Sequence, residues 1–258
     1  MKRLIAGATG FIGKALVKGW IKQGVDVIVI GRSKQKIHEV FEGCVQTITW
    51  KELREGIVED KDVQCMINLA GAGIADKRWS HQRKKDIMDS RINTTHAVAD
   101  YCLTSKVPLL NASAVGIYGM QEINKKAVPQ AFDEETVMPD DARDFLSSVC
   151  RSWEEATQPL KEAGIRTVNL RIGVVLGKGG GALKKMALPF YLFAGGPIGS
   201  GYQMVPWISL PDLCRAIEFL IAQQDIHGPV NLVSPGCVHQ RALARSLGKV
   251  LRRPSFLP

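Results

Sequence analysis

A glycine-rich turn directly behind the first apolar segment is the feature that most limits what this chain can fold into. Residues 7–13 read Gly-Ala-Thr-Gly-Phe-Ile-Gly, and residues 2–6 before them have the pattern of a short strand. Ile12, Leu16 and Trp20 then recur at helical spacing. Glycines let a backbone approach a pyrophosphate closely, and the N-terminus of the next helix offers free N–H groups and a positive dipole end. A strand, this turn and a helix in that order predict a dinucleotide-binding unit.

The end of the second expected strand indicates which dinucleotide the turn would hold. Residues 25–30 are mostly apolar and lead into Gly31-Arg32-Ser33. An NAD site usually has an acidic residue at this tip for the ribose 2′-hydroxyl, and this tip has none. Arg32 can pair with a 2′-phosphate, and Ser33 can donate a hydrogen bond to it. We therefore expect NADP(H) rather than NAD(H); the alternative is that Arg32 is a solvent-exposed loop residue.

Strand and helix patterns alternate along the rest of the chain, which is typical of a parallel sheet with helices on both faces. Further strands are expected at residues 45–49, 63–69, 107–113, 165–171 and 229–233, and helices at 80–104, 143–162, 209–222 and 239–251. Pro159 should kink the helix at 143–162. The expected fold class is α/β, a Rossmann-type doubly wound parallel sheet with a small C-terminal substrate-side portion. The glycine-rich loops at 177–181 and 195–201 either line a substrate cleft or are ordinary connections.

Composition limits the kinds of partner and site. The 258 residues include 34 lysines and arginines against 25 acidic residues, but the basic clusters are scattered and are not interleaved with aromatic residues. They indicate solvated surface with some attraction for an anionic ligand, and we expect no nucleic-acid partner.

The spacing of cysteines and histidines indicates whether a metal site is expected, and the apolar runs indicate whether a membrane span is. The six cysteines form no CxxC pair and the five histidines show no metal spacing, so we expect buried thiols in a reducing compartment and no metal site. No apolar run is long enough to span a membrane, and the first strand leaves no room for a presequence. A cytoplasmic protein without a membrane partner is expected.

Several motifs resemble those of an extended short-chain dehydrogenase/reductase. They are the turn at 7–13, Asn68-Leu69-Ala70-Gly71, Ser113 with Tyr118-Gly119, and residues 170–177. The segments 111–119, 153–154, 195–201 and 206–208 are similar to an atypical subgroup of the NAD-dependent epimerase/dehydratase superfamily, often labelled nucleoside-diphosphate-sugar epimerase-like. The resemblance covers essentially the whole chain.

The resemblance implies that NADP(H) lies across the carboxyl ends of the strands. The residues it implies for cofactor binding are Gly7, Thr9, Gly10, Phe11, Ile12, Gly13, Arg32, Ser33, Leu69, Ala70, Gly71, Ala112, Ser113 and Arg171. Trp50, after the third strand, either flanks the adenine or packs in the core.

The resemblance also implies a division of the chain. Residues 1–175, with late elements from 205–235, would form the NADP-binding domain. Residues 176–204 and 236–258 would form the substrate-side portion, truncated relative to the family. Superfamily members often dimerise through the two long helices, so a homodimer and a monomer are both open.

The chain departs from the superfamily at the catalytic positions. Dehydrogenases of this kind use a tyrosine as general acid/base and a lysine four residues later, which depresses the pKa of that tyrosine. The two positions fall here on Leu146 and Cys150, and Arg91 stands where an asparagine is usual. The standard proton-transfer pair is therefore absent.

Four other side chains are candidates for replacing that pair. Ser113 could orient a carbonyl and Tyr118 could donate a proton, while Asp144 and Cys150 lie near the vacated positions. Each of the last three has a structural alternative: a packed turn for Tyr118, a helix cap for Asp144 and a small buried hydrophobe for Cys150.

Three functions stay open from the sequence. The first is an NADP(H)-dependent oxidoreductase or epimerase-type enzyme acting on an unidentified small molecule, nucleotide-sugar-like or a carbonyl compound. The second is a non-catalytic NADP(H)-binding sensor or regulatory protein. The third is a structural relic with weak cofactor affinity, against which the intact turn and Arg32-Ser33 argue.

Overall fold

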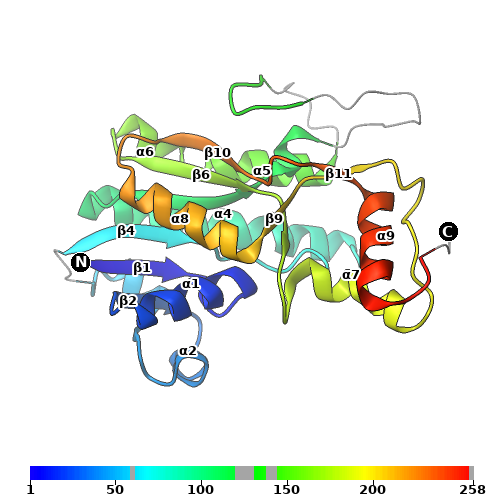
Figure 1. The fold of residues 1–258 in the computed structure, drawn as a ribbon. Coiled ribbons are helices and arrows are strands. Elements are labelled where there is room, and N and C mark those ends of the chain that lie inside the picture. The colour runs from blue at the N-terminus through cyan, green and yellow to red at the C-terminus, as the bar shows by residue number, and fades with distance from the viewer. Residues whose placement is uncertain (59–61, 120–130, 138–143, 256–258) are drawn as a thin grey trace.

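The centre of the molecule is a seven-stranded sheet in the order β10-β6-β5-β4-β1-β2-β3, with every neighbouring pair parallel (Figure 1). The computed structural model describes residues 1–58, 62–119, 131–137 and 144–255. The strands of this sheet are β1 (Lys2–Ala6), β2 (Asp26–Gly31), β3 (Gln46–Thr49), β4 (Val63–Asn68), β5 (Leu109–Ala114), β6 (Thr167–Ile172) and β10 (Gly228–Leu232). The order reverses between β1 and β4, and in open parallel sheets ligands bind beside that switch point.

Helices cover both faces of the sheet, and each face has its own hydrophobic core. The helices around the sheet are α1 (Phe11–Lys22), α2 (Lys34–Phe41), α3 (Trp50–Arg54), α4 (His81–Ser105), α5 (Phe145–Glu155), α6 (Gln158–Glu162) and α8 (Leu210–Ala222). Residues of α1, α2 and α8 pack in one core cluster, and residues of α3, α4 and α6 pack in the other. Figure 1 shows α1 and α8 on the near face and α4 behind the sheet.

The strands alternate their side chains between these two clusters. In β1, Ile5 belongs to the first cluster, while Leu4 and Ala6 belong to the second, and all three are fully buried. Burial on both faces explains why the strands read as continuous apolar runs rather than as alternating ones.

A smaller portion stands at one end of the sheet. It contains α7 (Gly181–Tyr191), α9 (Gln240–Leu251) and two short two-stranded sheets. One pairs β7 (Val174–Leu176) with β9 (Trp207–Ser209) in parallel; the other pairs β8 (Met204–Val205) with β11 (Val238–His239) antiparallel. Figure 1 shows α7 and α9 side by side there, away from α2 and β2.

The predicted α/β fold class is confirmed, and the expected strands agree with the structure to within about two residues at their ends. The continuous helix at 143–162 is wrong, and its residue 143 lies outside the described residues. Its described part forms two helices, α5 and α6, because Thr157 turns back and donates its hydroxyl to the carbonyl of Glu154, 2.7 Å away. Pro159 then lies in the first turn of α6, where no helical N–H is needed, so it starts a helix instead of kinking one.

The structure also bears on the expected state of the cysteines and on the expected absence of a membrane span. All six cysteines are free, but only Cys65, Cys102 and Cys150 are buried, whereas Cys44 and Cys237 are exposed, so the prediction of buried thiols is wrong for the exposed pair. No helix in the described ranges is long and apolar enough to cross a membrane.

Candidate functional site

The glycine turn is fixed by backbone contacts that leave no room for side chains. Gly7 has a φ of +80°, and a Cβ there would lie 2.5 Å from the carbonyl carbon of Leu69 at the end of β4. A Cβ at Gly13 would lie 2.5 Å from the carbonyl oxygen of Gly7. Gly10 is the N-cap of α1 and has no side chain to cap it, so the first N–H groups of that helix are not covered by a capping group.

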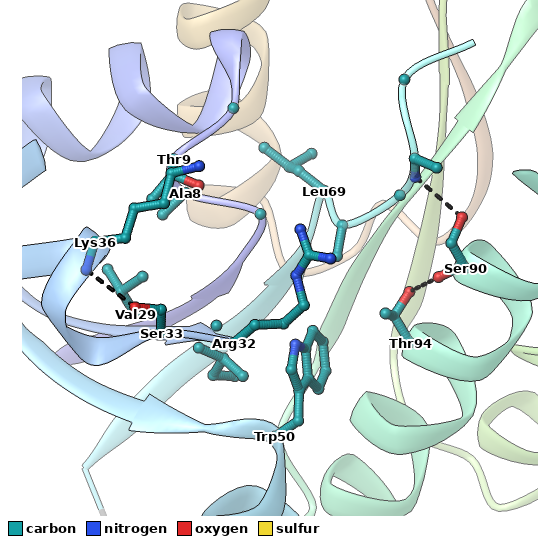
Figure 2. A pocket seen from close by; sticks show the side chains of 18 of the residues that line it. Ala8, Thr9, Val29, Arg32, Ser33, Lys36, Trp50, Leu69, Ser90 and Thr94 are labelled. Atoms are coloured by element: carbon teal, nitrogen blue, oxygen red, sulfur yellow. Dashed lines mark hydrogen bonds between the residues drawn. The ribbon is translucent and has the colours of Figure 1, made fainter. Parts of the chain in front are cut away.

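A cavity of about 1020 Å³ opens beside this turn, at the switch point of the sheet. Figure 2 shows it between the turn, the tip of β2, the end of β4 and the α4 helix. Its lining includes Gly7, Thr9, Gly10, Arg32, Ser33, Lys36, Trp50, Arg54, Leu69, Ala70, Gly71, Ser90 and Thr94. The volume lies at the upper end of that of small-molecule sites, which suits a ligand as long as a dinucleotide.

Unpaired cations gather at the β2 end of the cavity. The side chains of Arg32, Lys36 and Arg54 line it, and none makes a hydrogen bond or ion pair with another residue in the described part of the chain. Ser33 is the N-cap of α2, and its hydroxyl accepts a hydrogen bond from the N–H of Lys36 at 3.2 Å. Figure 2 shows the Arg32 side chain extending into the space between Leu69 and Trp50. This end of the cavity is built for an anion, and its hydroxyl still has a proton to donate.

A capping box holds Trp50 at the cavity wall. Trp50 begins α3, whose N-cap Thr49 accepts from the N–H of Glu52 at 3.2 Å, while Glu52 accepts from the N–H of Thr49 at 2.7 Å. Lys34 pairs with Glu52 at 2.6 Å, and this hydrogen bond, followed by those from Thr49, lowers the pKa of Glu52 to about 2. The half-buried ring of Trp50 both lines the cavity and packs against the core cluster of α3 and α4.

A second set of polar residues joins β5, α5 and β6. Ser113 is buried and donates its hydroxyl proton to Glu154 at 2.7 Å. Arg171 forms a two-pronged pair with the same carboxylate, at 2.9 and 3.0 Å. Burial opposes the charge of Arg171, but hydrogen bonding and attraction from Glu154 outweigh it, so the pKa of Arg171 is raised.

Tyr118 is the outer member of this set. Its hydroxyl accepts a hydrogen bond from Arg171 at 2.9 Å and lies 2.8 Å from the amide oxygen of Asn231 and 3.0 Å from the carbonyl of Asp133. The Tyr118 ring stacks on Phe132, with 5.1 Å between centroids. The guanidinium of Arg171 lies 5.2 Å from the centre of the Tyr118 ring. Tyr118 is thus held by one donor and two acceptors, and Arg171 both donates to its oxygen and lies against its ring.

The two vacated catalytic positions face the turn that follows β5. A Cβ on Gly116 would lie 3.6 Å from the sulfur of Cys150 and 3.8 Å from the Cβ of Leu146. Burial, then the charge of Glu154, raises the pKa of Cys150 to about 12, so its thiol stays protonated at neutral pH. Asp144 caps α5, accepting from the N–H groups of Leu146 at 2.8 Å and Ser147 at 2.9 Å. Neither Cys150 nor Asp144 is placed as a general base.

The aromatic residue of the glycine turn points away from the cavity. A Cβ on Gly177, Gly180 or Gly181 would lie 2.9, 2.7 or 2.6 Å from an atom of the Phe11 ring. The loop at 177–181 can therefore close around this ring because Gly177, Gly180 and Gly181 have no side chains. A second cavity, of about 380 Å³, lies here, with Phe11, Lys14, Lys18 and Lys178 in its lining.

Of the fourteen residues proposed for cofactor binding, eight line the large cavity and six do not. The residues that line the large cavity are Gly7, Thr9, Gly10, Arg32, Ser33, Leu69, Ala70 and Gly71; those that do not are Phe11, Ile12, Gly13, Ala112, Ser113 and Arg171. Ala112 is buried in the core cluster of α1 and α8. Several lining residues were not predicted from the sequence. They include Lys36, three residues after the helix cap Ser33, and the pair Ser90 and Thr94, whose spacing of four puts them on one face of α4.

The described residues contain no cluster of three or more His, Cys, Asp or Glu side chains that could hold a metal ion.

The fold and this cavity define a Rossmann-type α/β protein with a nucleotide-sized site at its switch point. The chain belongs to the NAD-dependent epimerase/dehydratase family, whose model matches residues 3–232. It is 36% identical to the chloroplastic epimerase family protein SDR39U1 homolog of Arabidopsis thaliana, over 98% of this chain and 72% of that protein. It is 34% identical to epimerase family protein YfhF of Bacillus subtilis, over 100% of this chain and 82% of that protein.

A solved structure is similar over the same span. The crystal structure of human epimerase family protein SDR39U1 (isoform 2) with NADPH superposes with a TM-score of 0.84, covering 100% of this chain and 82% of the human one at 32% identity.

Proposed function

We propose that this protein binds NADP(H) in the large cavity, with the 2′-phosphate at the tip of β2. The observation that carries the proposal is the set of unpaired cations there, Arg32, Lys36 and Arg54, beside the hydroxyl of Ser33 and with no acidic residue at the tip. An NAD site would put a carboxylate at this point. The NADPH in the structure of human SDR39U1 supports the same choice.

We further propose that the protein catalyses a redox step on a small molecule with a carbonyl or hydroxyl group. When bound, NADPH supplies the hydride for the carbonyl carbon. Tyr118 would supply the proton for the carbonyl oxygen, and Arg171 would stabilise the phenolate that remains. Ser113 would orient the carbonyl after its hydroxyl turns from Glu154. A positioned proton donor contributes about a hundred- to ten-thousandfold in rate, so a replacement for the missing tyrosine is needed.

Calorimetric titration with NADPH and NADH tests the cofactor assignment. The protein should bind NADPH more tightly than NADH, and Arg32→Ala should weaken NADPH binding about ten- to hundredfold because a charge-assisted pair is lost, leaving NADH binding unchanged. Lys161→Ala, an exposed cation on α6 outside the cavity, is the matched control. Equal affinity for the two dinucleotides, or no binding of either, would overturn the assignment.

A non-catalytic NADP(H) sensor is the second candidate. It is favoured by the uncharged side chains at the two usual catalytic positions, Leu146 and Cys150. Absorbance of the reduced nicotinamide, followed against a panel of nucleotide sugars and carbonyl compounds, separates the two. Turnover that is lost in Tyr118→Phe and Ser113→Ala while NADPH still binds supports the enzyme. Tight NADPH binding with no turnover, and no epimerised product by NMR, favours the sensor.

We also propose that the two parts of the chain expected from the sequence have separate binding roles. Residues 1–175 with 205–235 would bind the dinucleotide, and residues 176–204 with 236–258 would face the substrate. The helix α7, which follows the loop that encloses Phe11 and packs against α9, supports this division. A homodimer and a cytoplasmic location stay predictions.

A further inference from the structure

The second cavity, of about 380 Å³, is lined by cations that the proposed function does not use. Lys14 and Lys18 of α1 and Lys178 of the 177–181 loop are exposed residues of its lining. None of the described residues that line it is acidic. The side chains of the three lysines make no hydrogen bond or ion pair within the described ranges. The cavity therefore gathers three positive charges without a counter-charge from the protein.

The placement of Lys14 and Lys18 works against the stability of α1. The two residues are four apart and share one face of the helix, where like charges repel each other. Lys14 also lies near the N-terminus of α1, the positive end of the helix dipole, and the first turn has no acidic residue to offset it. A pattern that opposes local helix stability is typical of a functional position.

Two helix ends add partial positive charge to the same cavity. Gly10, the N-cap of α1, and Gly180, the N-cap of α7, both line it. Neither glycine has a side chain to cap its helix, and the two helices have 12 and 11 residues. Backbone N–H groups at an uncapped helix start can donate to an oxyanion. Together with the three lysines, these donors make the cavity suitable for a strongly charged anion.

The spacing of the lysines indicates an anion with more than one charged group. Lys14 and Lys18 are about one helical turn apart, or about 6 Å along the axis of α1. Lys178 comes from the loop and not from the helix. Lysine ammonium groups bind phosphate as point charges. Two linked phosphate groups can contact two such charges at once, whereas a single phosphate or carboxylate is too short to do so.

This cavity is separate from the one proposed for NADP(H). The cations at the tip of β2 line only the large cavity, and the three lysines line only the second. The two cavities share Thr9 and Gly10, so they meet at the glycine turn. We propose that the second cavity is a further binding site, for a small molecule that carries linked phosphate groups and is distinct from the dinucleotide. This site does not depend on the cofactor assignment.

Calorimetric titration with inorganic pyrophosphate tests the proposal in wild type, in Lys14→Gln with Lys18→Gln, and in Lys178→Gln. We expect the double variant to bind pyrophosphate about ten- to hundredfold more weakly than wild type, and Lys178→Gln about three- to tenfold more weakly, because charge-assisted contacts are lost. Inorganic phosphate should bind wild type about tenfold more weakly than pyrophosphate, since it reaches fewer of the charges.

Lys22→Gln is the matched control. Lys22 is an exposed lysine four residues after Lys18 on α1, and it lines neither cavity. This variant should bind pyrophosphate as wild type does. A loss in Lys22→Gln equal to that in the double variant would show unspecific attraction to a basic helix and would overturn the proposal.

NADPH separates the two sites. Pyrophosphate should bind NADPH-saturated protein as tightly as free protein, and Arg32→Ala should leave its binding unchanged. Competition by NADPH, or a loss in Arg32→Ala, would place the anion in the large cavity and overturn the proposal. No binding of pyrophosphate to wild type, or binding of inorganic phosphate with equal affinity, would overturn it too. Wild-type protein that binds pyrophosphate but neither dinucleotide would reject the cofactor assignment and support this site.

Discussion

At the residue scale, Gly7 shows how a single position can tie the local backbone to the ligand site. It combines a positive φ with a direct approach to the backbone of Leu69, so both its conformation and its contacts exclude a side chain. The approach brings the ends of β1 and β4 together, and the cavity opens between them.

Gly7→Ala should destabilise the protein by about 1–3 kcal/mol. An L-residue with this positive φ is strained, and its Cβ would clash with the backbone of Leu69, which is fixed in place by the sheet. Gly19→Ala on α1 is the control, since a Cβ there meets nothing within 4 Å. That change should raise stability by about 0.5–1 kcal/mol. Urea unfolding of both variants measures the difference. A Gly7→Ala protein as stable as Gly19→Ala would show that the turn tolerates a side chain.

A residue of the candidate site could be predicted from the sequence only where its residue type is itself unusual at that position. Gly7 and Arg32 could be found from the sequence because the first has a conformational requirement and the second replaces an expected acid. Lys36 and Arg54 could not, because an exposed lysine or arginine on a short helix looks the same whether it faces a ligand or water. Arg91 was noticed only as a departure at a usual asparagine position; its burial without an acid needed coordinates.

At the element scale, the five-residue helix α3 depends on its cap. A helix of this length is not stable alone, and the reciprocal Thr49–Glu52 bonds with the Lys34 contact fix its first turn. Trp50 is the first residue of that turn, so the cap also fixes one wall of the cavity.

The charge of Glu52 should give this cap a defined pH dependence. Its pKa in the folded protein is about 2, below its ordinary value of 4.5, so the stabilisation is complete above about 4.5 and is lost as the pH falls through about 2. Glu52→Gln keeps the hydrogen-bonding shape of the cap but has no charge. The Tm of wild type should therefore exceed that of Glu52→Gln at neutral pH, and the gap should close between pH 4.5 and 2. Thermal melts across that range measure it; a gap that does not change with pH would contradict the assignment.

Elements differed in how well their sequence defined them. The buried strands and α4 were predictable because long apolar or periodic segments leave few alternatives. The break between α5 and α6 was not, because it depends on a hydroxyl of Thr157 that folds back on one carbonyl, a contact with no periodic signature. α7 was missed because it follows a run of glycines and has Pro189 in its interior.

At the scale of the whole molecule, the charge is concentrated in the smaller portion. Residues 176–204 and 236–258 contain eight lysines and arginines and no acidic residue, while the whole chain has an excess of nine positive charges. The sequence predicted the parallel sheet correctly. It did not indicate the gathering of charge around the two cavities, because residues that are distant in the chain meet only after folding.

The cations that line the large cavity should make the binding of anionic ligands depend on ionic strength. Raising the salt from about 50 to about 500 mM should weaken NADPH binding about three- to tenfold, since the cations at the cavity are exposed enough to be screened. NADH, which has no 2′-phosphate, should show a smaller change. Titrations at several salt concentrations measure both slopes, and equal slopes for the two dinucleotides would contradict a cationic 2′-phosphate site.

The glycine-lined enclosure of Phe11 has a consequence for packing. Phe11 is the first residue of α1 and belongs to the glycine turn. The loop at 177–181, just before α7, closes around its ring. Phe11 is therefore a contact that the turn and the loop share, and a substitution that removes its ring would change the packing of both at once.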